Sequence, residues 1–330
     1  MAVEKRNIGQ FSITPIGYGC MNLSHAYGVP PTPEMAEKVL LKALDLGVDH
    51  FDTAALYGFG VNEELVGRVL KPHRSKFMLA SKCGMQGVDG KRVIDGRPET
   101  LKQTCEAGLK RLQTDVIDLY YLHRWDKSVP IEDSVGALAD LVREGKIKSI
   151  GLSEVSAATL RKAHAVHPIA AVQTEYSLWT RNAELGVLQA CKELGSAFVA
   201  FSPLARAFLA GKLRDVSALQ EKDIRRGMPR FQPDAYAANL TLLDGFAALA
   251  RDNGCTMAQL ALAWLLAQGE HVVPIPGTTN IGHLEENMGA LDVKLDAAVL
   301  AKAGQLINQK TVTGPRYPAS TLPEIDTEDF

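Results

Sequence analysis

The chain of 330 residues has few cysteines, and none of them forms a sequence pair of the kind that binds metals. Its five cysteines lie far apart, with no C-x-x-C motif and no histidine at metal-ligand spacing. We therefore expect free thiols and no metal site. The chain also lacks any run of about 18 uninterrupted apolar residues, so no ordinary membrane-spanning helix is expected.

The chain has no large excess of positive or negative charge. The 36 Lys and Arg residues nearly balance the 38 Asp and Glu residues, giving a formal net charge of −2. No basic run suits a phosphate backbone, so nucleic acid is a poor candidate partner. The first residues, Met-Ala-Val-Glu-Lys-Arg-Asn, carry charges where a secretory signal would be apolar. We expect a cytoplasmic protein.

The sequence does contain a repeated alternation of apolar strand-like runs and amphipathic helical stretches. With 46% apolar residues the chain can bury a substantial core, and we expect one domain spanning residues 1–330. Eight units of this kind predict a (β/α)8 barrel. The expected strands are Ile16–Gly19, Asp49–Thr53, Phe77–Lys82, Ile117–His123, Ile147–Ser153, Ala170–Glu175, Ala197–Ser202 and Val272–Pro276.

Segments outside this alternation are expected at both ends and in one loop. Residues Arg6 to Thr14 predict an N-terminal β-hairpin that turns at Gly9-Gln10. Pro203–Asp234 reads as a long loop after the seventh strand, and one more helix should end near Asn308, followed by a tail to Phe330. Apolar spacing predicts barrel helices such as Pro33–Leu46 and Pro98–Leu112.

Four side chains capable of acid-base chemistry lie at the ends of expected strands or just after them: Asp52, Tyr57, Lys82 and His123. The carboxyl ends of barrel strands open onto one face, so these residues should converge. A phenol is a poor proton donor at neutral pH unless a cation stabilises its anion, and Lys82 could supply that charge. Asp52 would keep Lys82 protonated, and His123 could orient a carbonyl oxygen.

Those four residues, together with four longer motifs, resemble the aldo-keto reductases. The motifs are Gly47–Gly58, Leu109–His123, Phe201–Gly211 and Pro274–Asn287, and the likeness covers residues 5–310. Within that superfamily the chain looks like the bacterial-type branch that includes potassium-channel β subunits. The resemblance implies hydride transfer from NADPH to an aldehyde or ketone, with Tyr57 as general acid. Lys82 and Asp52 would adjust the acidity of the Tyr57 hydroxyl, and His123 would orient the carbonyl.

The same resemblance implies a set of cofactor contacts. It places Ser153, Glu154 and Gln173 at the nicotinamide carboxamide, beside Asp52, and it places Met21 and Asn22 near the ribose. Phe201 would stack on the ring. Ser202, Leu204, Arg206 and Lys212 would contact the pyrophosphate, and the adenosine end would meet Ile275, Gly277, Thr278, Thr279, His283, Glu286 and Asn287.

Two departures from the family pattern affect these expectations. Glu154 replaces the usual Asn, and a carboxylate cannot donate a hydrogen bond to the carboxamide. Relatives place Arg or Lys for the 2′-phosphate where this chain has Thr278, Thr279, Asn280 and His283, which should weaken the preference for NADPH. We expect NADPH first, with NADH as an alternative cofactor.

The substrate and the oligomeric state are less constrained. Tyr27, Phe59, Trp125 and Trp179 fall in or beside expected mouth loops and predict a pocket for a bulky or aromatic carbonyl compound. A monomer is expected by analogy. Two other functions stay open: a barrel lyase that forms a Schiff base on Lys82, and a nucleotide-binding regulatory subunit with slow turnover.

Overall fold

The predicted strands form a ring of eight parallel strands in the computed structural model, which describes residues 4–330. Neighbours pair in the order β3-β4-β5-β8-β9-β10-β11-β12. Their bounds are β3 (Tyr18–Gly19), β4 (His50–Asp52), β5 (Met78–Cys83), β8 (Ile117–Leu122), β9 (Ile147–Ser153), β10 (Ile169–Glu175), β11 (Ala197–Phe201) and β12 (Val272–Pro274). Each predicted strand is confirmed to within two residues at either end. Met1–Val3, part of the charged start noted above, lie outside the described residues.

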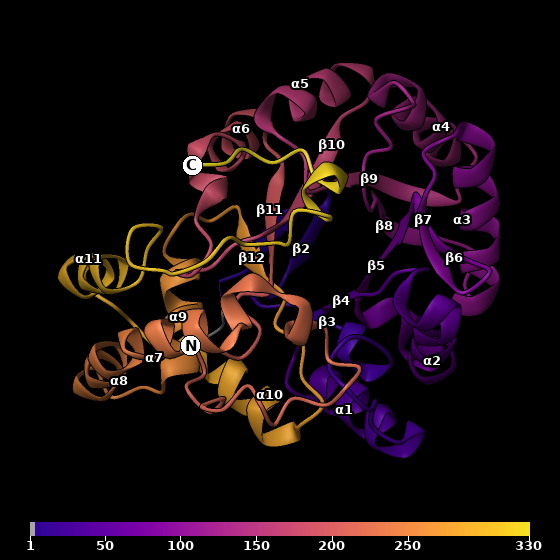
Figure 1. Ribbon diagram of the computed structural model, residues 1–330. Coiled ribbons are helices and arrows are strands. Elements are labelled where there is room, and N and C mark those ends of the chain that lie inside the picture. Colours follow the sequence, from indigo (N-terminus) through magenta and orange to yellow (C-terminus); the bar gives the residue numbers. More distant parts are fainter. Residues whose placement is uncertain (1–3) are drawn as a thin grey trace.

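Backbone hydrogen bonds between the first and last strands close the ring, around which the helices are arranged in Figure 1. The N–H of Gly17 donates to the carbonyl of Pro274 at 3.0 Å, and that of Gly19 donates to Pro276 at 3.4 Å. A Cβ on Gly19 would lie 2.9 Å from the Ile275 carbonyl oxygen, so a larger residue would push this seam apart. The predicted (β/α)8 barrel is confirmed.

Helices surround the ring, as the apolar spacing predicts. Those between successive strands are α1 (Pro33–Asp45), α2 (Val61–Leu70), α3 (Pro98–Leu112), α4 (Ile131–Arg143), α5 (Ala157–Val166), α6 (Val187–Leu194) and α9 (Met257–Leu266), and α10 (Ile281–Met288) follows β12. Two more helices, α7 (Pro233–Leu240) and α8 (Leu242–Asp252), precede α9 between β11 and β12, and α11 (Ala297–Leu306) follows α10. Across residues 4–330, no helix combines the length and apolarity needed to cross a lipid bilayer.

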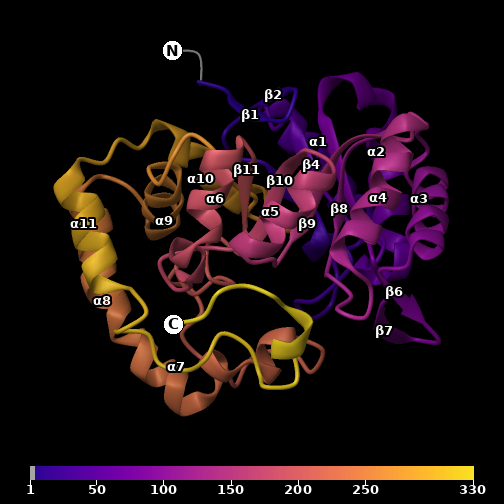
Figure 2. The same ribbon diagram turned by 90° about the horizontal axis from the view of Figure 1, so that it is seen from above.

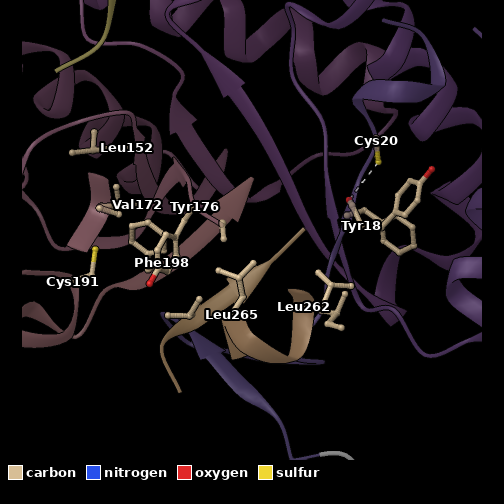
Figure 3. Close-up of a cluster of buried hydrophobic side chains, with 14 of the residues drawn as sticks. Tyr18, Cys20, Leu152, Val172, Tyr176, Cys191, Phe198, Leu262 and Leu265 are labelled. Carbon is tan, nitrogen blue, oxygen red and sulfur yellow. Dashed lines mark hydrogen bonds between the residues drawn. The ribbon is translucent and has the colours of Figure 1, made fainter. Parts of the chain in front are cut away.

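Strand side chains alternate between the barrel interior and the surrounding helices. Apolar residues such as Ala80, Leu119 and Val199 fill the interior. On the outer face, Tyr176 and Phe198 pack edge to face at 5.6 Å, near Leu265 of α9 (Figure 3). Full burial of such side chains stabilises the fold by about 1.5–3 kcal/mol each.

Different segments cover the two ends of the barrel (Figure 2). The predicted hairpin, β1 (Arg6–Ile8) with β2 (Phe11–Ile13), lies at the end away from the C-terminal tail and sends Ile8 and Ile13 into the interior cluster. At the opposite end lies a second hairpin, β6 (Met85–Val88) with β7 (Lys91–Ile94), which the sequence analysis missed. Its turn, Asp89-Gly90, has φ of 50° and 74°, as a two-residue hairpin turn requires.

The tail beyond α11 crosses the carboxyl end of the barrel (Figure 1). The Asp326 N–H donates to the Glu154 carbonyl at 3.0 Å, and the Ala157 N–H donates to Glu328 at 2.8 Å. On the other side, Arg92 of β7 forms an ion pair with Glu324. The tail thus bridges the ends of the central strands and the second hairpin.

Candidate active site

A cavity of about 750 Å³ opens at the carboxyl ends of the barrel strands. Its walls come from strand ends, the loop after β11, the start of α10 and the tail. This is the end of a barrel where catalytic groups usually lie.

Asp52, Tyr57 and Lys82 meet at one end of this cavity. Asp52 ends β4, Tyr57 begins the 3-10 turn Tyr57–Gly60, and Lys82 lies near the end of β5. The ammonium of Lys82 donates to the Asp52 carboxylate, to the Thr53 carbonyl at 2.8 Å and to the Tyr57 hydroxyl oxygen at 3.2 Å. Lys82 is 0% exposed and lies behind the cavity wall, whereas Asp52 and Tyr57 line it.

Burial and the neighbouring groups keep both the amine and the phenol protonated at this end. Burial acts to lower the pKa of Lys82, but Asp52 and Tyr57 together outweigh it, and the net pKa is raised. Burial raises the pKa of Tyr57 above its ordinary value, although the Lys82 charge opposes that rise. The sequence analysis had expected Lys82 to acidify the phenol, and its effect is present but smaller than that of burial.

His123 follows β8 and lines the cavity beside Tyr57. The two rings stand nearly perpendicular with centroids 5.9 Å apart. Burial, with the charges of Lys82 and Arg124, holds the pKa of His123 well below its ordinary value. The imidazole is therefore neutral near pH 7 and carries one N–H that can donate to an oxygen.

Tyr121 of β8 lies next to the buried Lys82 ammonium. The ring centroid of Tyr121 lies 5.8 Å from the Lys82 nitrogen. A Cβ on Gly151 of β9 would come within 2.3 Å of the Tyr121 ring. Only glycine leaves room for the ring at that position.

Gln173 and Ser153 lie at neighbouring strand ends and line the cavity, but Glu154 does not. The Gln173 amide donates to the second carboxylate oxygen of Asp52 at 2.7 Å. Glu154 adopts a left-handed backbone with φ of 56° and is buried on the side of the tail. Its carboxylate accepts from the Arg316 guanidinium at 2.5 Å and from the Glu175 N–H at 2.9 Å.

Arg316 connects the tail to two strand ends. It also donates to Glu175 at 3.1 Å, and Arg206 reaches the same carboxylate at 3.1 Å. Burial would raise the pKa of Glu175, but Arg316, Arg206 and Arg230 lower it to about 2. The residue that departs from the family pattern, Glu154, therefore contributes to a buried charge network instead of to the cavity wall.

The remaining predicted cofactor residues line the middle and the far end of the cavity. They are Met21, Asn22, Phe201, Ser202, Leu204, Arg206, Lys212, Ile275, Gly277, Thr278, Thr279, His283, Glu286 and Asn287. The loop after β11 places Ser202, Ala205, Arg206 and Ala207 at positive φ, a costly backbone that clusters at functional sites.

At the far end the structure supplies a cation that the Thr278–Asn287 stretch lacks. The Lys212 ammonium lies 3.2 Å from a ring nitrogen of His283 and 3.9 Å from Glu286. These residues are about 70 positions apart in the chain, so sequence reasoning gave no reason to pair them.

The aromatic pocket predicted from the sequence is mostly wrong. Tyr27 lines the cavity, but Phe59, Trp125 and Trp179 lie outside it. Phe59 is 54% exposed and packs against the second hairpin at Gly87. Trp179 is buried and stacks on Phe208 at 4.2 Å, and the Trp125 indole donates to the Val129 carbonyl at 2.9 Å.

Other residues that line the cavity were missed. They include His25, Met85, Arg92, Arg124 and Tyr317. Arg124 directly follows His123, which was a usable signal, and Arg92 follows the Asp89-Gly90 hairpin turn. Nothing local in the sequence indicates that Tyr317 of the tail returns to the barrel mouth.

Known proteins share both this sequence pattern and this architecture. A model described as "Aldo/keto reductase family" matches residues 15–308. The chain belongs to the aldo/keto reductase family. It is therefore an oxidoreductase, and the family expected from the sequence is confirmed. Its assignment to the potassium-channel-related branch stays a prediction.

Three aldo/keto reductase relatives illustrate the likeness. "Probable aldo-keto reductase 1" of Glycine max is 46% identical over 310 residues, covering 93% of this chain and 89% of that protein. "Aldo-keto reductase yakc [NADP(+)]" of Schizosaccharomyces pombe is 42% identical over 325 residues, covering 96% and 95%. The structure of the glycerol dehydrogenase AKR11B4 from Gluconobacter oxydans superposes with a TM-score of 0.86 at 27% identity, covering 97% of this chain and 99% of that one.

Proposed function

We propose that this chain reduces an aldehyde or ketone to the alcohol with NADPH as hydride donor, in a reversible reaction. The observation that carries the proposal is the Tyr57 hydroxyl, which lines the cavity 3.2 Å from the buried Lys82 ammonium. Support for the cofactor comes from the fission yeast relative, whose name includes NADP(+).

The residues of the cavity fit a dinucleotide. Its 750 Å³ lies within the range of about 300–1,000 Å³ typical of small-molecule and cofactor sites. Ser153 and Gln173 would hold the carboxamide, Phe201 would stack on the nicotinamide, and Lys212 would bind a phosphate. We leave Glu154 out of this set, because its carboxylate is bound to Arg316.

Residues of this chain supply the proton that the carbonyl oxygen takes up during reduction. When bound, NADPH supplies the hydride that reaches the carbonyl carbon. Tyr57 donates its proton to the carbonyl oxygen, and the Lys82 ammonium stabilises the phenolate left behind. Asp52 keeps that ammonium in place, and neutral His123 donates a hydrogen bond that orients the carbonyl oxygen.

A Schiff-base reaction at Lys82 is not favoured by the geometry. Such a reaction needs a neutral amine that reaches the substrate. Lys82 is 0% exposed, is hydrogen bonded to three partners and has a raised pKa. No specific observation favours a regulatory role with slow turnover.

A panel of aldehydes and ketones tests the proposed function. Purified protein is mixed with each carbonyl and either NADPH or NADH, and coenzyme oxidation is followed at 340 nm. We expect turnover of about 1–1000 per second with good substrates, the range of ordinary enzymes. Turnover below about one per minute across the panel would overturn the proposal and favour the regulatory role.

A further inference from the structure

The cations of the cavity wall are paired, with one exception. Carboxylates neutralise four of them among the described residues: Arg92 with Glu324, Arg206 with Glu175 at 3.1 Å, Arg225 with Asp223 at 2.6 Å, and Lys212 with Glu286 at 3.9 Å. The fifth, Arg124, has no carboxylate within ion-pair distance in residues 4–330, and its hydrogen-bond acceptors are the His123 carbonyl and the Ser153 hydroxyl. The wall therefore carries an uncompensated positive charge next to His123.

Arg124 is held in place by neutral partners. One terminal nitrogen donates to the His123 carbonyl at 2.7 Å and to the Ser153 hydroxyl at 3.2 Å. Its Nε is buried and has no hydrogen-bond partner in the described part of the chain. A partly buried guanidinium with an unsatisfied N–H is costly unless an anion completes it.

This unpaired charge lies beside the groups proposed to act on the carbonyl. Its field opposes the effect of burial on the pKa of Tyr57, and it adds to burial and to Lys82 in lowering the pKa of His123. Arg92 and His25 also face His123. Three carboxylates also line the cavity, those of Asp52, Glu286 and Glu324, and each is balanced by a cation: Lys82, Lys212 and Arg92, respectively.

We propose that Arg124 is a substrate-binding residue that receives a carboxylate, so that the preferred substrates are oxo acids rather than neutral carbonyl compounds. The proposal rests on the proposed function. The guanidinium fork suits a carboxylate, which accepts two parallel hydrogen bonds from it. The carbonyl carbon takes the hydride, its oxygen takes the proton of Tyr57, and the carboxylate passes through unchanged.

Matched pairs of an oxo acid and its methyl ester test the subsite. Pairs from pyruvate to 4-carboxybenzaldehyde vary the spacer between carbonyl and carboxylate, and kcat/KM is measured for each member with NADPH. For at least one spacer, the wild-type protein should prefer the acid about tenfold or more. Arg124→Gln should lower that acid-to-ester ratio about ten- to hundredfold, mainly through KM, and Arg124→Lys should restore part of it.

Arg143→Gln is the control, because it removes the same charge from an α4 side chain that is 77% exposed. Its acid-to-ester ratio should equal that of the wild type. A wild-type ratio near one for every pair would overturn the subsite while leaving the proposed reduction intact, whereas no oxidation of NADPH by any carbonyl would overturn the proposed function itself. If Arg124→Gln weakens NADPH binding in a fluorescence titration and slows acid and ester equally, Arg124 serves the cofactor, and the subsite is refuted.

Discussion

The ion pairs between the tail and the barrel should make a large contribution to stability, which Arg316→Met would remove. Arg316 has a side chain only 7% exposed and bonds to both Glu154 and Glu175. The lowering of the Glu175 pKa from 4.5 to about 2 corresponds to about 3 kcal/mol of stability at neutral pH, shared among Arg316, Arg206 and Arg230. Breaking a buried pair by removing one partner typically costs about 3–5 kcal/mol. We expect Arg316→Met to lower the free energy of unfolding by about 3 kcal/mol.

The pH dependence of this loss follows from the sign of the shift. A carboxylate whose pKa is lower in the folded state stabilises the fold above pH 4.5, and this contribution is lost as the pH falls toward 2. The difference between wild type and Arg316→Met should therefore be largest at neutral pH. Near pH 3.5 it should be smaller by roughly 1 kcal/mol.

Urea unfolding followed by circular dichroism at both pH values measures this difference. Arg143→Met, which breaks an exposed pair with Asp140, should change stability by less than about 0.5 kcal/mol. Adding Glu154→Gln to Arg316→Met should recover part of the loss, because it removes one unpaired buried carboxylate. A loss below about 1 kcal/mol for Arg316→Met, or one independent of pH, would refute the reasoning.

Four further predictions concern the site. Lys82→Met removes the cation that stabilises the phenolate, so kcat for reduction should fall at least about 100-fold. A Lys82→Met variant that keeps a tenth of the wild-type kcat would contradict this role. Because the pKa of Tyr57 is raised above 10.0, kcat for reduction should stay constant with rising pH until above pH 10, and an alkaline loss near pH 8 would be incompatible with Tyr57 as the donor. Lys212→Gln should raise the Kd of NADPH more than that of NADH if Lys212 and His283 meet the 2′-phosphate, whereas equal weakening would place Lys212 at the pyrophosphate. Gly151→Ala should destabilise the protein by about 1–3 kcal/mol in thermal or urea unfolding, since its Cβ would overlap the Tyr121 ring, and a neutral effect would mean that the ring moves freely.

The barrel and the catalytic end could be predicted because both depend on local patterns. Short apolar runs bounded by turn residues defined the strands, and chemistry-bearing residues at the ends of such runs had to share one face. Asp52, Tyr57 and Lys82 meet for this reason, although they come from separate segments. The missed hairpin had a local signal in Asp89-Gly90 that the sequence analysis did not use.

Contacts between distant segments could not be predicted in this way. Glu154 and Arg316 are 162 residues apart, and nothing near either residue indicates the other. Trp179 was assigned to the pocket because it follows a strand, but the apolar cluster around Phe208 holds it in the core. Long-range packing decides whether a side chain after a strand lines the cavity or enters the core. The residues next to the strand end do not indicate which of the two occurs.

The central claim is that the phenol of Tyr57, held beside the Lys82 ammonium, delivers the proton during carbonyl reduction. Tyr57→Phe tests it most directly, with turnover followed at 340 nm and NADPH binding measured by fluorescence titration on the same protein. We predict an NADPH Kd close to that of the wild type and a kcat lower by about 100- to 10,000-fold. Turnover within a factor of about ten of the wild type, with the coenzyme bound, would contradict the account.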